Sequence, residues 1–223
     1  MRRRSLILFD LDGTLTDPGL GITNSVMYAL ERFGIRETDR SRLYPFIGPP
    51  LTESFQRFYG FSPEDARRAV DVYREYFRDR GIFENKVYPG IPGFLERLCR
   101  DGRRLAVATS KPEPFALRIV EHFGLSEFFV RVAGAAMDET RTRKEEVIRY
   151  ALAELGSPAP EDTLMVGDRE HDVIGAAACG IETLGVLYGY GSREELLRAG
   201  AEYLADTPEA AGDLILNTAA AGE

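Results

Sequence analysis

The sequence predicts an α/β fold: a doubly wound parallel sheet with a small helical domain inserted near its beginning. The apolar run at residues 6–9 indicates a buried strand that ends at Asp10. Roughly 90 residues separate its loop from the next strong strand signal, at 105–108, far more than a parallel crossover requires. Beyond residue 88, helical and strand patterns alternate, which is typical of a doubly wound sheet.

The inserted segment has helical patterns and its own apolar residues. Residues 20–88 contain 13 of the 23 aromatic residues, and their spacing predicts helices over 22–33, through 55–58, and from Pro63 toward Gly81. Ser62 is the expected N-cap of the last helix. Packing inside this segment explains the rings better than a binding role does. We therefore set the core domain at 1–16 and 89–223 and the helical domain at 17–88.

The later elements follow in chain order. Strands are expected at 129–133, 163–166, 183–187 and near Tyr203, with helices at 94–98, at 115–123, from Thr142, and after Thr207-Pro208. Capping boxes are expected from Thr142 to Glu145 and from Ser192 to Glu195. Thr109 and Ser110 are expected to close the strand at 105 and open a helix, where hydroxyl and backbone N–H groups can receive a phosphate.

Acidic residues gather at two of these strand ends. Asp10 and Asp12 precede a glycine turn at Gly13 and Thr14, while Asp168 and Asp172 follow the strand at 163–166. Clustered carboxylates repel one another unless a cation or a shared proton intervenes, and hard oxygen ligands suit magnesium. A solvated turn or a helix-start acid would explain each pair alone, but not the convergence of all four.

Basic residues open the helix after the third strand. A cation at a helix N-terminus is unfavourable unless an anion offsets it. Lys144 in that position therefore favours a functional role over a solvated lysine, with Arg141 and Arg143 as rival candidates.

Composition excludes several classes of function. The net charge of −8 argues against affinity for nucleic acid polymers or anionic membranes. No apolar window approaches the roughly 20 residues of a membrane span, so a cytoplasmic protein is expected. Cys99 and Cys179 lie in apolar helical patterns, which favours reduced core thiols over a disulfide.

These motifs, taken together, resemble those of the haloacid dehalogenase superfamily. The residues that carry the resemblance are Asp10-x-Asp12-Gly13-Thr14, Thr109, Lys144 and Gly167-Asp168-x-x-x-Asp172. The chain looks most like the phosphoglycolate phosphatase group, whose helical cap is inserted after the first motif. Glu145 departs from that group, which usually has proline there. The segments at Gly48-Pro49-Pro50-Leu51 and Gly189-Tyr190-Gly191-Ser192 look more like less well-defined phosphatases, some described as nucleotidases.

The resemblance implies a magnesium-dependent phosphomonoester hydrolase acting through an aspartyl-phosphate. It makes Asp10 the nucleophile and Asp12 the acid and base, with Thr109 and Lys144 as further catalytic groups. It assigns phosphate contacts to Gly13, Thr14, Ser110 and Gly48. It assigns the metal to Asp10, the Asp12 carbonyl and Asp168, with Asp172 beside the metal, either through water or by orienting Lys144. The expected substrate is a small phosphate ester, phosphoglycolate or a nucleoside monophosphate, handled by a monomer or homodimer.

Two other functions stay open at this stage. A sugar phosphomutase would share the active site and retain the phosphoryl group under a closed cap. A receiver-like signalling module would also phosphorylate an aspartate at a strand end, although it needs no insertion of this size.

Overall fold

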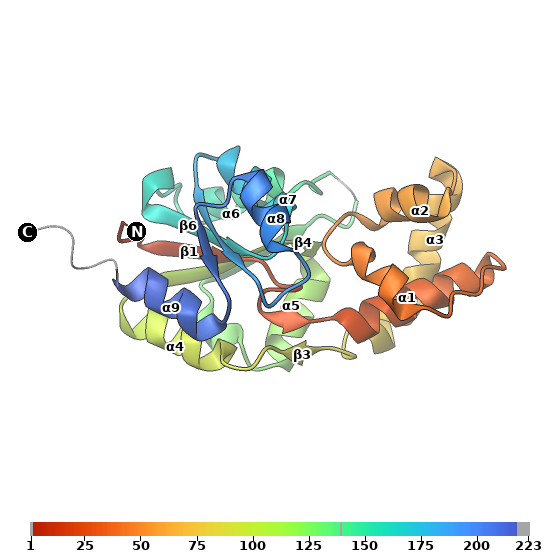
Figure 1. The fold of residues 1–223 in the computed structure, drawn as a ribbon, viewed down its shortest axis with the longest axis horizontal. Helices are drawn as coiled ribbons and strands as arrows, with labels where there is room; N and C mark the ends of the chain where they lie inside the picture. The colour runs from red at the N-terminus through yellow and green to blue at the C-terminus, as the bar shows by residue number, and fades with distance from the viewer. Residues whose placement is uncertain (1, 139, 218–223) are drawn as a thin grey trace, which may run out of the picture. The chain divides into compact units, whose positions relative to one another are not determined.

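The computed structural model describes residues 2–138 and 140–217 and divides the chain into two compact units. The core unit comprises Met1–Leu15 and Val87–Glu223, and the inserted unit comprises Thr16–Lys86. Short strands β2 (Thr16–Asp17) and β3 (Lys86–Val87) pair where the sequence enters and leaves the inserted unit (Figure 1). The ends of the predicted core range, residue 1 and residues 218–223, lie outside the described residues.

A six-stranded sheet forms the centre of the core unit, in the order β5-β4-β1-β6-β7-β8, with every pair parallel. Strand β1 (Leu6–Phe9) is buried between β4 (Arg104–Pro112) and β6 (Thr163–Gly167). The outer strands are β5 (Arg131–Ala135), β7 (Glu182–Val186) and β8 (Tyr203–Ala205). The chain runs from β1 to one side of the sheet and returns to the other, so the end of β1 lies at a topological switch point, where α/β sheets bind ligands.

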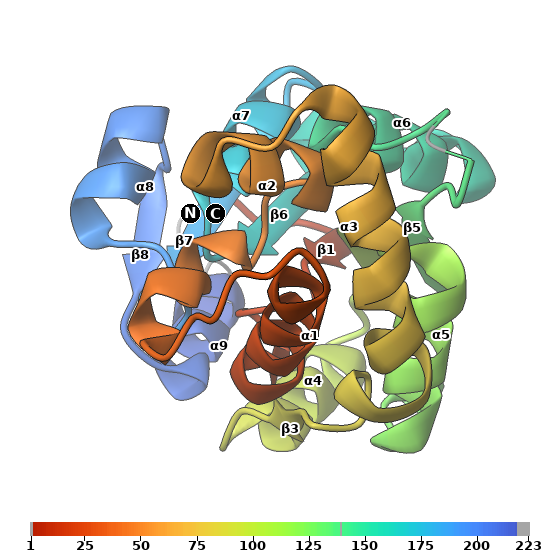
Figure 2. The same ribbon diagram turned by 90° about the vertical axis from the view of Figure 1, so that its right-hand side faces the viewer.

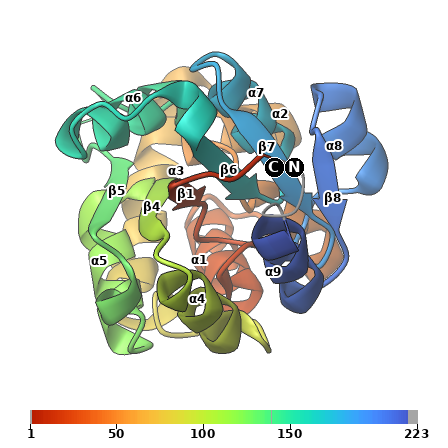
Figure 3. The ribbon, with the colours of Figure 1, turned by 90° about the vertical axis from the view of Figure 1, so that its left-hand side faces the viewer.

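Helices cover both faces of this sheet (Figure 3). One face is covered by α6 (Lys144–Glu154) and α7 (Glu170–Ala177), against which α8 (Arg193–Ala199) packs. The other face is covered by α4 (Ile91–Arg100), α5 (Glu113–His122) and α9 (Pro208–Leu216). Buried aliphatic side chains fill the layer under α6 and α7. The predicted doubly wound α/β fold is therefore confirmed.

The inserted unit is helical (Figure 2). It contains α1 (Gly19–Arg32), a 3₁₀ segment η1 (Arg40–Phe46), α2 (Leu51–Tyr59), α3 (Pro63–Tyr76) and a π turn η2 (Phe77–Gly81). The Ser62 side chain accepts a hydrogen bond from the Asp65 N–H, as expected of the α3 N-cap. The aromatic rings of the inserted unit pack on one another, with Phe55 stacked on Phe61 and Tyr73 on Phe77. The expected aromatic core is present.

The prediction that Thr109 and Ser110 close a strand and open a helix is wrong. Strand β4 continues through Thr109 and Ser110 to Pro112, and α5 begins only at Glu113. Because Lys111 precedes a proline, its backbone is biased toward extended geometry, which prolongs the strand. Thr109 and Ser110 therefore do not open a helix.

Two expected caps also differ. Helix α6 begins at Lys144, and the Glu146 carboxylate, rather than Glu145, accepts from the N–H groups of Thr142 and Arg143. Ser192 caps α8 as predicted, but the Glu195 carboxylate accepts from the Glu170 N–H and the Arg169 side chain instead of closing the box. The strand expected at 129–133 lies at 131–135, since a 3₁₀ turn (η3, Ser126–Phe128) delays it.

Both cysteines are free, but neither is a core residue: Cys99 is exposed and Cys179 is half-buried. Cys179 falls after α7 ends, in a turn, so the helical pattern that predicted its burial does not extend that far. Among the described residues, no helix is long and apolar enough to cross a membrane.

Candidate active site

The carboxyl ends of β1, β4 and β6 meet at one edge of the sheet in the core unit. Phe9 is in register with Val107 of β4 and Val166 of β6, so the residues that follow each strand are brought together. The Asp10 N–H also donates to the Val166 carbonyl at 2.9 Å, which extends the pairing past the end of β1. This edge holds the acidic residues of both predicted motifs.

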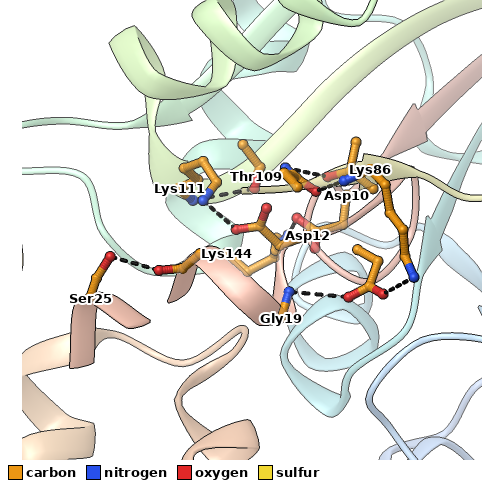
Figure 4. A network of polar contacts seen from close by, with 12 residues as sticks. Asp10, Asp12, Gly19, Ser25, Lys86, Thr109, Lys111 and Lys144 are labelled. Carbon is orange, nitrogen blue, oxygen red and sulfur yellow. Dashed lines mark hydrogen bonds and ion pairs between the residues drawn. The ribbon is translucent and has the colours of Figure 1, made fainter. Parts of the chain in front are cut away.

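Lys144 is fixed between two of these acids, Asp10, which Figure 4 labels, and Asp172. Its Nζ donates to Asp10 Oδ1 at 2.6 Å and to the Ala108 carbonyl at 3.0 Å, and lies 2.7 Å from Asp172 Oδ1. An ammonium has three donors, and these three contacts use them all. Burial alone would lower the pKa of Lys144, but the carboxylates of Asp10 and Asp172 outweigh it, so its pKa is raised. The site therefore contains a buried lysine that is hydrogen-bonded to Asp10 and whose neighbouring carboxylates favour its charged form.

The rival arginines lie elsewhere. The Arg141 Nε donates to the Gly134 carbonyl at 3.0 Å, and its guanidinium stacks 3.7 Å above the Tyr150 ring. Arg143 is exposed and pairs with Glu145 and Glu146. Of the three basic candidates, Lys144 is the one that contacts Asp10.

Asp10, Asp168 and Asp172 form a buried acidic triad, in which one carboxylate oxygen from each lies within 4.8 Å of the others. Burial raises the pKa of Asp168 well above its usual range, and the charges of Asp172 and Asp10 add to that rise. Such a triad of hard oxygen donors fits a divalent cation, which would offset the repulsion. The Asp12 carboxylate is not part of this group, and the predicted metal contact through its backbone carbonyl stays a prediction.

Two donors hold the Asp168 carboxylate in place. Thr14 Oγ1 donates to Oδ1 at 3.1 Å and the Tyr190 N–H donates to Oδ2 at 2.8 Å. Gly13 has a φ of 88°, and a Cβ there would lie 2.2 Å from Asp168 Oδ2. Thr14 is fully buried. In the structure Gly13 and Thr14 therefore support a metal-ligand candidate, while their phosphate contacts stay predictions.

The remaining predicted residues lie in both units. Thr109 on β4 is buried, and its Oγ1 accepts from the Lys111 N–H at 3.2 Å. Ser110 is half-buried on the same strand. Gly48 belongs to the inserted unit, between η1 and α2, with a φ of 106°. The phosphate contacts predicted for Ser110 and Gly48 stay predictions.

Sequence reasoning missed Lys111 (Figure 4). Its Nζ lies 2.6 Å from Asp12 Oδ2, and both side chains are largely buried. Burial raises the pKa of the Asp12 carboxyl, and the charge of Lys111 offsets part of that rise. The available signal was strand alternation, because residues 109 and 111 of an extended chain project toward the same side. Each aspartate of the first motif thus contacts its own lysine.

Sequence reasoning also gave no role to the loop after β7. Besides the Tyr190 N–H, the loop contributes Tyr188, whose hydroxyl donates to the Thr14 carbonyl at 3.0 Å. A Cβ at Gly191 would lie 1.9 Å from the backbone oxygen of Asp168. Residues 188–191, which we name the Asp168 clamp, therefore pack directly on the end of β6.

The site thus combines paired acids at two parallel strand ends, a buried lysine and an acidic triad that could hold a cation. A family model described as haloacid dehalogenase-like hydrolase matches residues 7–186. The chain therefore belongs to the haloacid dehalogenase-like hydrolases, which confirms the family predicted from the motifs and the expectation of an enzyme.

Several known proteins are similar over most of the chain. A 5'-nucleotidase of Pseudomonas aeruginosa is 53% identical over 190 residues, which cover 85% of this chain and 86% of that protein. Tyrosine-protein kinase PtkA of Mycobacterium tuberculosis is 46% identical over 186 residues, covering 83% of this chain and 63% of that protein. The crystal structure of a "predicted phosphatase" from Clostridium acetobutylicum matches with a TM-score of 0.94 and 47% identity, covering 96% and 99% of the two chains.

Proposed function

We propose that this protein is a magnesium-dependent phosphatase that hydrolyses a small phosphomonoester through a phosphorylated Asp10. One observation carries the proposal: Asp10 belongs to a buried acidic triad and is bonded at 2.6 Å to the buried ammonium of Lys144. A carboxylate nucleophile and a phosphate repel each other, so attack requires fixed positive charge around both. Lys144 supplies part of that charge from a position that its three contacts make rigid.

Magnesium fits the triad of Asp10, Asp168 and Asp172, and when bound it supplies further positive charge against the phosphoryl oxygens. The Asp168 clamp and Thr14 orient one member of the triad before any ligand arrives. Preorganised groups need no rearrangement during the reaction, and this saving in reorganisation energy increases the rate.

Asp12 is the proposed acid and base. In the first step an Asp10 oxygen bonds to phosphorus, the ester P–O bond breaks, and the leaving oxygen takes a proton from Asp12. In the second step Asp12 takes a proton from water, whose oxygen attacks phosphorus and releases phosphate and the Asp10 carboxylate. Asp12 Oδ1 is buried and has no hydrogen-bond partner among the described residues, so it is an oxygen that can hold the proton in transfer. General acid–base catalysis of this kind contributes about 10²–10⁴-fold in rate.

Of the small esters, we favour a nucleoside 5'-monophosphate over phosphoglycolate. The support is the 53% identity to a protein named 5'-nucleotidase, together with Glu145 in place of the proline usual in the phosphoglycolate phosphatase group. We assign the choice of leaving group to the inserted unit as a cap, in a cytoplasmic monomer or homodimer.

The test is phosphate release from a panel of esters, with and without a chelator. The panel contains nucleoside monophosphates, phosphoglycolate, pyrophosphate, glucose phosphates and a phosphotyrosine peptide. We expect hydrolysis of the nucleoside monophosphates to exceed that of the others, to stop on chelation and to return with magnesium. Asp10→Asn should lower activity at least about 10³-fold, as for loss of an essential nucleophile. Asp213→Asn, at an exposed side chain of α9, serves as the matched control.

Other outcomes would redirect the assignment. Activity that survives strong chelation contradicts the metal. Conversion of one glucose phosphate into its isomer without phosphate release indicates a phosphomutase, and a long-lived phosphorylated Asp10 that is not hydrolysed indicates a receiver-like module. Transfer from ATP to tyrosine would indicate the kinase activity in the name of the relative that is 46% identical.

A further inference from the structure

The two aspartates of the first motif are each paired with a different lysine. Lys144, from α6, contacts Asp10 and Asp172, whereas Lys111, from β4, contacts Asp12. Only the first lysine has a role in the reaction proposed above. We propose that Lys111 is a positioning residue that holds the Asp12 carboxylate in the orientation needed for proton transfer. This inference rests on the proposed function, in which Asp12 protonates the leaving group.

The geometry supports an orienting role. Lys111 Nζ lies 2.6 Å from Asp12 Oδ2, and the two side chains are 6% and 11% exposed. Little water reaches such a pair, so the lysine is the group that fixes Oδ2. A carboxylate is planar, and fixing one oxygen restricts where the other can lie. Asp12 Oδ1 is the oxygen without a hydrogen-bond partner among the described residues. Lys111 therefore determines which oxygen is presented to the leaving group.

The pair is not needed to join the strands that carry it. Strands β1 and β4 already pair in parallel from Leu6 with Arg104 to Phe9 with Val107. The backbone at Lys111 is held independently, because its N–H donates to Thr109 Oγ1. Buried ion pairs contribute little net stability compared with apolar replacements. A role in orienting Asp12 therefore explains the pair better than a role in holding the fold.

The reaction gives this role a specific signature. An alkyl ester such as a nucleoside monophosphate expels a basic alkoxide and needs a well-placed acid, whereas 4-nitrophenyl phosphate expels a stable phenolate and needs little help. Lys111→Met keeps an unbranched side chain, one atom shorter, and removes the charge. It should lower turnover of the alkyl ester by about 10²-fold. With the aryl ester it should still give a burst of about one phenolate per site before slow turnover.

A double-variant cycle separates orientation of Asp12 from any direct contact of Lys111 with substrate. If Lys111 acts through Asp12, adding Lys111→Met to Asp12→Asn should change the burst rate by less than about twofold. Losses that multiply in the double variant would overturn the inference. The double variant removes both charges of the buried pair, so this comparison stands even if Lys111→Met alone leaves Asp12 unpaired and unfolds the protein.

Arg97→Met is the matched control, because it removes an exposed ion pair of the same unit, with Asp213 of α9. Its ratio of aryl to alkyl turnover should equal that of the wild type. If thermal unfolding shows that Lys111→Met is folded, and the variant keeps the wild-type ratio of aryl to alkyl turnover, the inference about Lys111 is overturned while the proposed function stands. If the wild type hydrolyses no alkyl phosphomonoester at all, the proposed function fails instead.

Discussion

Charged side chains in the core unit and in the inserted unit are held in different surroundings. At the site, the ion pair of Lys144 with Asp10 is no more than 8% exposed on either side. In the inserted unit, the ion pair of Arg68 with Asp65 is 67% and 43% exposed. Water screens the second pair and barely reaches the first. The distance between two charges therefore says little about their importance until burial is known.

Burial also changes what the surrounding chain must supply. Buried charges need partners for their polar atoms, and the core unit provides them from three strand ends and the Asp168 clamp. Aromatic rings fill much of the interior of the inserted unit; Phe46, for example, packs edge-on against Phe55. The core unit thus combines an apolar core with a cluster of buried charges at one sheet edge, whereas the inserted unit packs mainly by apolar contact.

The variant with the largest expected effect removes one buried charge. Asp168→Asn keeps an acceptor for Thr14 but takes a negative charge from the triad, so hydrolysis should fall by about 10²-fold or more. In wild type, magnesium at 100 times its dissociation constant should add about 2.7 kcal/mol to the free energy of unfolding. In Asp168→Asn, most of this magnesium-induced stabilisation should be absent. Thermal unfolding with and without magnesium measures it. An unchanged magnesium-induced shift would contradict the triad as the metal site.

An intermediate test loosens the support of the same charge. Gly191→Ala places a Cβ 1.9 Å from the Asp168 backbone oxygen, and overpacking of this kind costs about 1–3 kcal/mol. Urea unfolding should show that loss, together with weaker magnesium binding. Gly93→Ala on α4 is the matched control, since nothing lies within 4 Å of a Cβ there. Equal stability of the two variants would mean that the clamp adapts and does not fix Asp168.

The smallest expected effect comes from an exposed charge. Arg68→Ala removes a pair that water already screens, so the free energy of unfolding should change by less than about 0.5 kcal/mol, and phosphate release should not change. Chemical denaturation and the ester panel check both. A loss above about 1 kcal/mol would show that the pair of Arg68 with Asp65 contributes more than its exposure implies.

Much of the site was predictable because its residues follow strong local signals. Asp10 and Asp168 come directly after apolar strands, and parallel strands end at one edge, so their meeting follows from the fold. Lys144 was predictable because a cation at a helix start needs an anion. By contrast, the one sequence signal for Lys111 is its alternation with Thr109 along the strand, and its contact with Asp12 depends on the pairing of β1 with β4.

Other features depend on choices that a single sequence leaves balanced. Glu145 and Glu146 can both serve as capping acids, and a shift of one residue in the N-cap, from Thr142 to Arg143, selected Glu146. The Asp168 clamp follows β7, and its contact with the end of β6 depends on tertiary structure. No local sequence pattern predicts that contact. Local chemistry thus predicts which residues are functional better than it predicts what holds them.

The central place of β1 in the sheet has a consequence for how the protein is made. Leu6 pairs with Arg104 on one side and Thr163 on the other, so in a growing chain one edge of β1 stays unpaired until β4 is made and the other until β6 is made. The inserted unit is continuous in sequence and has its own core, so it can fold during that wait. Its folding shortens the effective loop between β1 and β4, which lowers the entropy cost of closing the sheet. The acidic triad can therefore form only after β6 has joined β1.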